Sequence, residues 1–189
     1  LVLGSHTMDH RVAELTELTY ADPGNTYGLA LWVGTWAFAV QIYCDFSGYS
    51  DIAVGLSRLF GIELIQNFKA PYASAGPSEF WRRWHISLST WFRDYVYLPL
   101  GGSRGGRIRT LRNLVLTMFV SGLWHGAAWN FVVWGLYHGL LLLVHALVGK
   151  TGWWRGVMRR LGRTGELLAW ALTFQCVVLG WVLFRVDAI

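Results

Sequence analysis

A stretch of 36 residues, 113–148, contains no Asp, Glu, Lys or Arg. Basic residues lie close on both sides of it: Arg104, Arg107, Arg109 and Arg112 before it, and Lys150, Arg155, Arg159, Arg160 and Arg163 after it. Such a stretch is typical of a membrane-embedded segment, whose backbone must be helical to satisfy its own hydrogen bonds. Basic loops stay in the cytoplasm, so both ends are predicted to lie on that side. The segment must therefore enter the membrane and return.

The composition indicates a membrane protein throughout the chain. Hydrophobic residues make up 54% and charged residues only 14%, and there are 12 Trp. These values are wrong for an ordinary soluble domain. The net charge of +5 comes from arginines beside apolar stretches, so membrane topology explains it and no nucleic-acid partner is predicted. No metal-ligand set and no nucleotide-binding fingerprint is present, so neither a metal nor a tightly bound cofactor is predicted.

We predict an all-α integral membrane protein, with multi-pass transmembrane helices and short re-entrant or interfacial helices around a funnel. Residues 1–28 form a polar loop leading to the first span, and residues 29–148 form a core that holds two histidine motifs. Residues 149–166 form a basic cytoplasmic loop, and residues 167–189 a further, truncated span. The chain starts on Leu1 and stops after an apolar run, so we expect a fragment of a larger protein.

The first span is predicted at residues 29–49, with a break around Gly48 and an interfacial or re-entrant helix at residues 52–65. Asp45 and Asp51 flank the break at membrane depth, where a carboxylate is costly unless it is paired or hydrated. They could line a polar cavity. Alternatively, Asp45, Ser47 and Ser50 could cap helix ends at Gly48.

A single amphipathic helix is predicted at residues 79–98, after a loop at residues 67–76. Ser78 is its expected N-cap, with Glu79 in its first turn. Its apolar residues recur at steps of three and four: Trp81, Trp84, Leu88, Trp91, Tyr95 and Leu98. A polar stripe runs beside them: Arg82, His85, Ser89 and Arg93. Such a helix either rests at the membrane interface or walls a polar funnel.

His125 is predicted at the apex of the 113–148 excursion, where the natural break in the sequence falls. A neutral imidazole in an apolar wall can take a proton from a hydroxyl near neutral pH. Gly122 and Gly126 leave room for a close approach, and Asn130 could orient a partner. The alternative is that His125 is a packed histidine without a chemical role.

Three other histidines in this part of the chain have weaker claims to chemistry. His85 shares its stripe with Arg82 and Arg93 and could position a donor or simply pack. His138 and His145 are assigned to packing or to polar contacts between helices.

Three sequence blocks carry a resemblance to a known family. They read Q-I-Y-C-D-F-S-G-Y-S-D-I-A at 41–53, W-R-R-W-H-I-S-L-S-T-W-F-R-D-Y-V-Y-L-P-L-G-G at 81–102 and G-L-W-H-G-A-A-W-N-F-V-V-W-G at 122–135. In this order they resemble the membrane-bound O-acyltransferase (MBOAT) family, and its bacterial alginate O-acetyltransferase branch in particular, over residues 29–147. The resemblance implies a multi-pass bacterial inner-membrane protein, with helices around a funnel and an acyl group brought from the cytoplasmic side.

The resemblance also implies site residues and partners. The family's essential histidine maps to His125, and the histidine of the other block maps to His85. The acyl donor would be acetyl-coenzyme A, whose phosphates could meet Arg104, Arg107 and Arg109, although topology alone also explains these arginines. The acetyl group would pass to an extracytoplasmic polysaccharide such as alginate, through a periplasmic acetyltransferase partner.

Two other functions remain open from the sequence. D-alanyl transfer to a teichoic-acid-type acceptor would use the same chemistry with another acyl group. A non-enzymatic membrane channel or structural partner would tolerate changes at both histidines.

Overall fold

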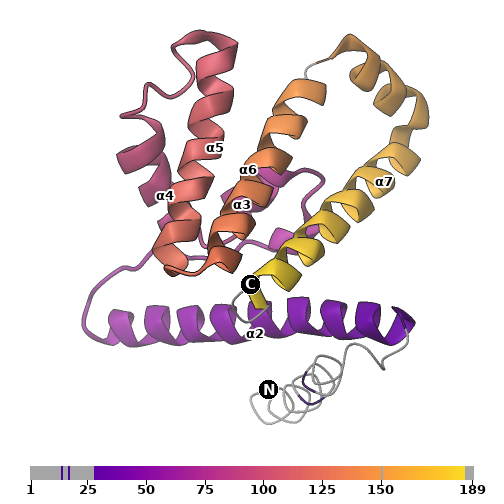
Figure 1. Cartoon of the computed structure of the whole chain (residues 1–189). Coiled ribbons are helices and arrows are strands. Elements are labelled where there is room, and N and C mark those ends of the chain that lie inside the picture. The colour runs from indigo at the N-terminus through magenta and orange to yellow at the C-terminus, as the bar shows by residue number, and fades with distance from the viewer. Residues whose placement is uncertain (1–13, 15–16, 18–27, 150, 186–189) are drawn as a thin grey trace. The chain divides into compact units, whose positions relative to one another are not determined.

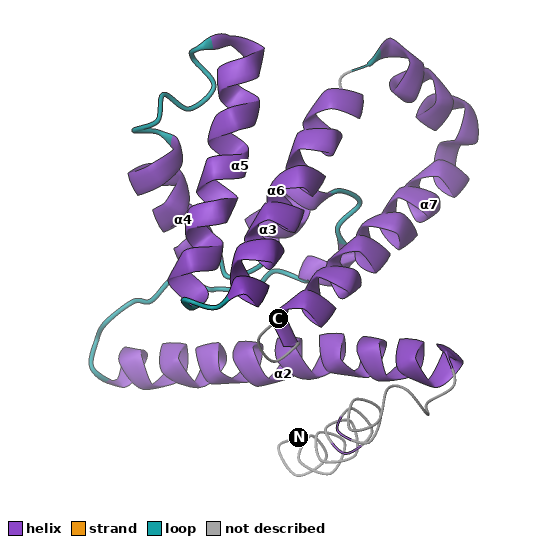
Figure 2. Cartoon of the chain, viewed as in Figure 1, coloured by secondary structure: helices purple, strands orange, loops and turns teal. Residues whose placement is uncertain are grey.

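The computed structural model describes residues 14, 17, 28–149 and 151–185, and all regular structure within them is helical (Figure 2). Three helices are long and apolar enough to cross a membrane: Gly28–Leu59, Trp129–Val148 and Gly152–Arg185. The all-α membrane fold is therefore confirmed. The predicted polar loop at residues 1–28 lies almost wholly outside the described residues. The chain divides into two compact units, Leu1–Leu64 and Ile65–Ile189, which are described separately.

In the first unit, helix α2 (Gly28–Leu59) runs for 32 residues without interruption (Figure 1). The predicted break at Gly48 is wrong, and with it the capping role of Asp45, Ser47 and Ser50. Inside the helix the Ser47 hydroxyl donates to the Cys44 carbonyl at 3.4 Å, which lets a polar residue remain in a helix interior. Residues 52–59, predicted as a separate interfacial helix, continue α2. The interpretation of Asp45 and Asp51 as cavity-lining residues stays a prediction.

The second unit begins with short helices where one long helix was predicted. The expected loop at residues 67–76 contains a single 3-10 turn, η1 (Pro71–Ala73). The predicted helix at 79–98 is instead α3 (Pro77–Arg83), α4 (Ile86–Phe92) and a π-helical turn, η2 (Arg93–Tyr97). The break falls at Trp84 and His85, and its cause is described with the site below.

The start of α3 also differs from its prediction. Gly76, not Ser78, occupies the N-cap position, and Pro77 takes the first helical position, where its missing N–H costs nothing. Glu79 lies in the first turn as predicted. Its carboxylate accepts the Ala75 N–H at 2.9 Å and forms an ion pair of 2.6 Å with Arg83, so it helps to fix the entry into the helix.

Residues 113–148 lie in a helical hairpin, while their passage into the membrane and back stays a prediction. Helix α5 (Gly106–His125) and helix α6 (Trp129–Val148) pack side by side as a hairpin (Figure 1). The helices approach closely because glycines face each other at Gly122 and Gly135. A Cβ at position 135 would lie 2.5 Å from the Met118 carbonyl oxygen and 3.2 Å from the Gly122 Cα. Small residues of this kind let helix backbones touch inside a membrane.

Helix α7 (Gly152–Arg185) completes the unit and bends at Gly162, whose φ of 51° and ψ of −129° are not helical. The basic segment predicted as a loop at 149–166 is thus helical from Gly152. Arginine has high helix propensity, so the charge that indicated a loop is fully compatible with a helix. The second part of α7 packs against α6, where the Tyr137 hydroxyl donates to the Cys176 carbonyl at 2.8 Å.

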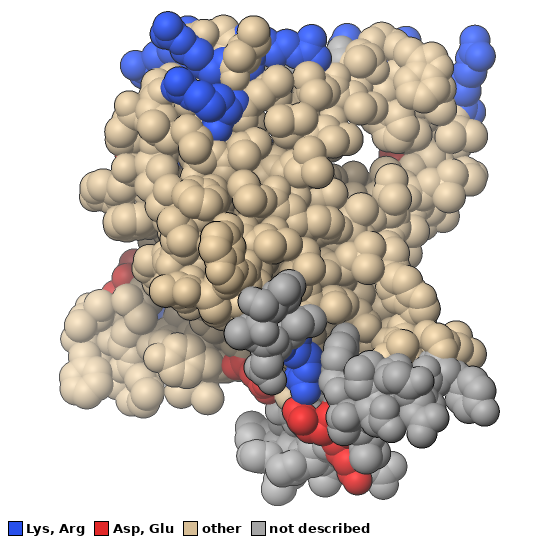
Figure 3. Space-filling model, in the orientation of Figure 1, with Lys and Arg blue, Asp and Glu red and all other residues tan. Residues whose placement is uncertain are grey.

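Arginines gather at one end of the second unit (Figure 3). They come from the segment around the start of α5 and from the first part of α7, which are the two basic groups that the sequence predicted to lie together. His125 ends α5, so it lies at the opposite end of the hairpin from these arginines. A cytoplasmic location of the basic end stays a prediction.

Candidate active site

His85 sits on the break between α3 and α4 in a left-handed backbone conformation, with φ 42° and ψ 59°. An L-residue pays a steric penalty in this region, and such strain persists only where the surroundings hold it. Asn67 stabilises this backbone conformation through hydrogen bonds to the two residues that follow His85. Its carbonyl accepts the Ile86 N–H at 2.9 Å, and its side-chain oxygen accepts the Ser87 N–H at 3.1 Å and the Ser87 hydroxyl at 2.6 Å. Asn67 thus caps α4 from twenty residues earlier in the chain.

Of the two histidines of the predicted site, His125 acts electrostatically on His85. Burial, and to a smaller extent the nearby His125, lowers the pKa of the His85 imidazole to about 4. His85 is therefore neutral at pH 7, when one ring nitrogen carries a proton and the other is an acceptor. His125 therefore lies close enough to His85 to affect its charge state, while a common site and the chemical roles of both histidines stay a prediction.

His125 is half-buried, and its imidazole is enclosed by four aromatic rings. Trp124, Trp134 and Phe184 stand almost perpendicular to it, with ring centroids 5.0, 5.0 and 5.3 Å away. Phe131 lies closer to parallel at 6.2 Å. These rings come from α5, α6 and α7, so the hairpin turn and the last helix together build the surroundings of this imidazole. Trp124 is the neighbour of His125 in the sequence, whereas no residue spacing indicates Phe184.

An aromatic core holds the break and α7 together. Trp84, which precedes His85, is buried and its ring centroid lies 4.8 Å from that of Trp181. The Trp181 indole N–H donates to the Tyr72 hydroxyl at 3.0 Å, and the Trp170 indole N–H donates to the Tyr72 carbonyl at 2.7 Å. Residues from η1, the break and α7 thus fix the backbone that carries His85.

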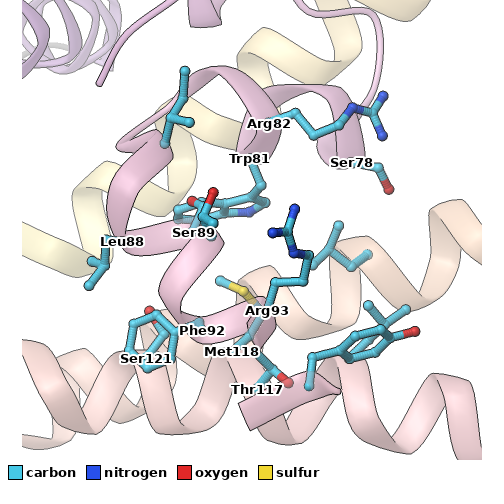
Figure 4. Close-up of a pocket in the computed structure, with 15 residues that line it drawn as sticks. Ser78, Trp81, Arg82, Leu88, Ser89, Phe92, Arg93, Thr117, Met118 and Ser121 are labelled. Carbon is cyan, nitrogen blue, oxygen red and sulfur yellow. The ribbon is translucent and has the colours of Figure 1, made fainter. Parts of the chain in front are cut away.

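A cavity of about 460 Å³ lies beside this region, between the short helices and α5 (Figure 4). Figure 4 shows the guanidinium of Arg93 in the space near Ser78 and Arg82 of α3. The cavity reaches Ser121 on α5, one helical turn before His125. Neither histidine lines it. The rest of its lining is mainly apolar, and its polar residues are Ser78, Arg82, Ser89, Thr90, Arg93, Tyr97, Thr117 and Ser121.

A second cavity, of about 350 Å³, is lined by arginines at the basic end. Arg104 and Arg109, two of the predicted donor-binding residues, line it. The third, Arg107, is not part of it, and its guanidinium donates to the Leu147 carbonyl at 3.4 Å. Arg112, which the prediction omitted, does line it and donates to the Asn113 side-chain oxygen at 2.9 Å. Its place in the same arginine cluster was the only signal for it in the sequence.

The other two histidines take different positions. His138 is buried, and both of its ring nitrogens lack a hydrogen-bond partner. Its ring packs between Trp81 and Trp134 at 5.1 and 5.0 Å, which confirms the predicted packing role. His145 is exposed near the far end of α6. Among the described residues, no three His, Cys, Asp or Glu side chains gather as a metal site would require.

Comparison with known proteins settles the family. The sequence model of the MBOAT, membrane-bound O-acyltransferase, family matches residues 2–184. The chain belongs to the MBOAT family. Both histidines and both arginine groups described above fall within the matched residues.

Similar members of this family are known from bacteria. The chain is 50% identical over 156 residues to a probable alginate O-acetylase AlgI of Pseudomonas syringae pv. tomato, covering 82% of this chain and 29% of that protein. It is 42% identical over 155 residues to a peptidoglycan O-acetyltransferase of Helicobacter pylori, covering 82% and 28%. A teichoic acid D-alanyltransferase of Bacillus subtilis is 32% identical over 159 residues, covering 79% and 39%. The chain thus spans about three tenths of the length of the O-acetylases.

Proposed function

We propose that this MBOAT chain is part of an enzyme that moves an acetyl group from a cytoplasmic thioester, acetyl-coenzyme A, for O-acetylation of an extracytoplasmic polysaccharide such as alginate. The observation that carries this proposal is the meeting of two imidazoles, His85 on a strained break and His125 at a helix end, within electrostatic reach. Family membership supports acyl transfer as the reaction class.

The comparisons favour acetyl over D-alanyl as the transferred group. The identity to proteins named as O-acetylases is 50% and 42%, against 32% to a protein named as a D-alanyltransferase. The enzyme would reside in the bacterial inner membrane and would pass the acetyl group on with the help of a periplasmic acetyltransferase. Transfer to a teichoic-acid-type acceptor is the second candidate, and it is distinguished by which acyl donor the protein consumes.

In the proposed reaction His125 acts as the general base. Its unprotonated ring nitrogen takes the proton of the acceptor hydroxyl as the hydroxyl oxygen attacks the thioester carbonyl carbon. The C–S bond then breaks, and the leaving thiolate takes the proton back from the imidazolium. His85, neutral at pH 7, donates a hydrogen bond from its ring N–H to the carbonyl oxygen as negative charge develops there.

The proposed donor site is the cavity lined by Arg104, Arg109 and Arg112, whose guanidiniums suit the phosphates of coenzyme A. His125 lies thirteen positions after Arg112 on α5, which is about 20 Å along a helix. The cavity that reaches Ser121 lies beside the intervening part of α5 and could take the extended arm of the donor.

The proposal is tested by changing His125 to Ala in the full-length protein and measuring ester-linked acetate on the polysaccharide. We expect loss of acetylation with an unchanged amount of protein in the membrane. The matched control is His145→Ala, because His145 lies in the last turn of α6, at the end farthest from the hairpin turn and His125. This variant should keep acetylation. Retained acetylation in the His125→Ala protein would reject the proposal.

A further inference from the structure

A third cavity, of about 680 Å³, lies between α6 and α7. It contains none of the residues proposed above for acyl transfer or for donor binding. Gly162, where α7 bends, is part of its lining, and Figure 1 shows the two parts of α7 running in different directions on either side of this bend. The volume falls in the range of cavities that hold small organic ligands, about 300–1,000 Å³.

One continuous stretch of chain surrounds most of this cavity. The lining runs from Leu141 on α6 through the first part of α7 to Cys176 on its second part, and Ala75 and Pro77 complete one edge. The ring closes where the Tyr137 hydroxyl donates to the Cys176 carbonyl at 2.8 Å. A further helix could pass through this ring only by threading a closed loop of chain, which folded proteins almost never do. A slender, flexible ligand meets no such restriction.

The lining changes in character from one end of the cavity to the other. Arg159 precedes the bend by three residues and Glu166 follows it by four, so one end carries charge. Leu141 lies one turn after Tyr137 and Leu172 one turn before Cys176, so the end where the ring closes is apolar. A ligand that matches this cavity has a charged end and an apolar end, which is the form of a membrane lipid.

The charged end carries one cation and one anion. The guanidinium of Arg159 suits the oxygens of a phosphate, and the carboxylate of Glu166 attracts an ammonium group. A headgroup that contains both a phosphate and an amine complements both residues, whereas a headgroup with a phosphate alone is repelled by Glu166. Trp154 lines the cavity as well, and tryptophan is enriched at the level of lipid headgroups in membrane proteins.

We propose that this cavity binds one aminophospholipid, of the phosphatidylethanolamine type. Its phosphate contacts Arg159, its ammonium group contacts Glu166, and an acyl chain lies between Leu141 and Leu172. Basic pockets between membrane helices are known to bind lipid headgroups. The lipid contacts both parts of α7 and α6 at once, so it stabilises the bend at Gly162. This inference does not depend on the acetyl transfer proposed above.

The test is native mass spectrometry of the full-length protein released from nanodiscs that contain equal amounts of phosphatidylethanolamine and phosphatidylglycerol. The lipid of interest is the one that stays bound at the collision energy that strips the others. We expect phosphatidylethanolamine to exceed phosphatidylglycerol there by about threefold to fivefold. Glu166→Gln should bring this ratio to about one, because it removes the partner of the amine. Arg159→Gln should lower the retention of both lipids.

Two further variants complete the test. Arg160→Gln removes the same charge as Arg159→Gln from a position outside the lining, and lipid retention should not change. Ala169→Phe fills the apolar part of the cavity without a change of charge and should expel the lipid. An unchanged lipid ratio in Glu166→Gln overturns the inference, as does a wild-type protein that retains no lipid. Equal retention by the wild type and Ala169→Phe also overturns it, since that result is expected if another part of the full-length protein covers the cavity.

Discussion

At the scale of single residues, the backbone at position 85 carries as much information as the imidazole. A left-handed conformation in a residue other than glycine is uncommon. Here it is held by three hydrogen bonds that Asn67 accepts. The conformation lets Trp84 enter the aromatic core while α4 begins in a new direction. Strain that is held so firmly is often found where a side chain has a chemical task.

Two substitutions distinguish the effect of the backbone conformation at residue 85 from the effect of its side chain. His85→Gly relieves the left-handed penalty and His85→Ala keeps it, so we expect the glycine variant to be more stable by about 1–2 kcal/mol. Thermal or chemical unfolding of the full-length protein in detergent measures the difference. Acetyl transfer should be strongly reduced in both, because both lack the imidazole. If His85→Gly transfers acetyl normally, His85 has only a backbone role.

At the scale of helices, the contact between α5 and α6 is set by glycine. Gly139 extends the contact by a further turn, since a Cβ there would lie 3.1 Å from the Val115 Cα. The close approach places the hairpin turn, and therefore His125, at a fixed position against Phe131 and Trp134. A larger side chain at one of these glycine positions would push the helices apart. The imidazole of His125 would then move relative to the aromatic rings around it.

Gly135→Ala should lower the free energy of unfolding by about 1–3 kcal/mol, because its Cβ has no room beside the Met118 carbonyl. The matched control is Gly156→Ala in α7, where a Cβ meets nothing within 4 Å. That change should be neutral or slightly stabilising, since alanine favours helix over glycine. Equal unfolding free energies for the two variants would show that the contact is looser than described.

The hairpin could be predicted from sequence because its cause is local. A charge-free stretch between two basic groups has few ways to fold in a membrane, and the W-H-G-A-A-W block is the only break in it. The break at Trp84 and His85 could not be predicted, because the apolar period continues across it without a change of step. Its cause is Asn67, whose side-chain oxygen accepts the N–H of Ser87, twenty residues later in the chain. The contacts of Trp134 and Phe184 with His125 depend on how α6 packs against α7. This packing between helices has no signature in the spacing of residues along the chain.

At the scale of the whole molecule, the second unit has two chemically different ends. Arginines gather at one end (Figure 3), and His125 lies at the opposite end of the α5–α6 hairpin. An elongated donor with phosphates at one end and a thioester at the other matches such a separation. The chain spans about three tenths of the length of the O-acetylases it matches.

Replacing Arg104, Arg109 or Arg112 with Gln should raise the KM for acetyl-coenzyme A by about twofold to fivefold each, because an exposed charge contact contributes up to about 1 kcal/mol. The kcat should not change. Arg107→Gln removes the same charge outside the cavity and is the control. Steady-state kinetics on membranes from the full-length protein measure both constants. Equal KM values for all four variants would leave membrane topology as the sole role of these arginines.

The glycine contact between α5 and α6 has a consequence for how substrates travel. The two backbones are in contact at Gly122 and Gly135. At this contact there is no space between α5 and α6 through which water or a lipid tail could pass. In the proposed reaction, the thioester would therefore travel along the side of α5 that carries the cavity with Arg93 and Ser121, and not between α5 and α6.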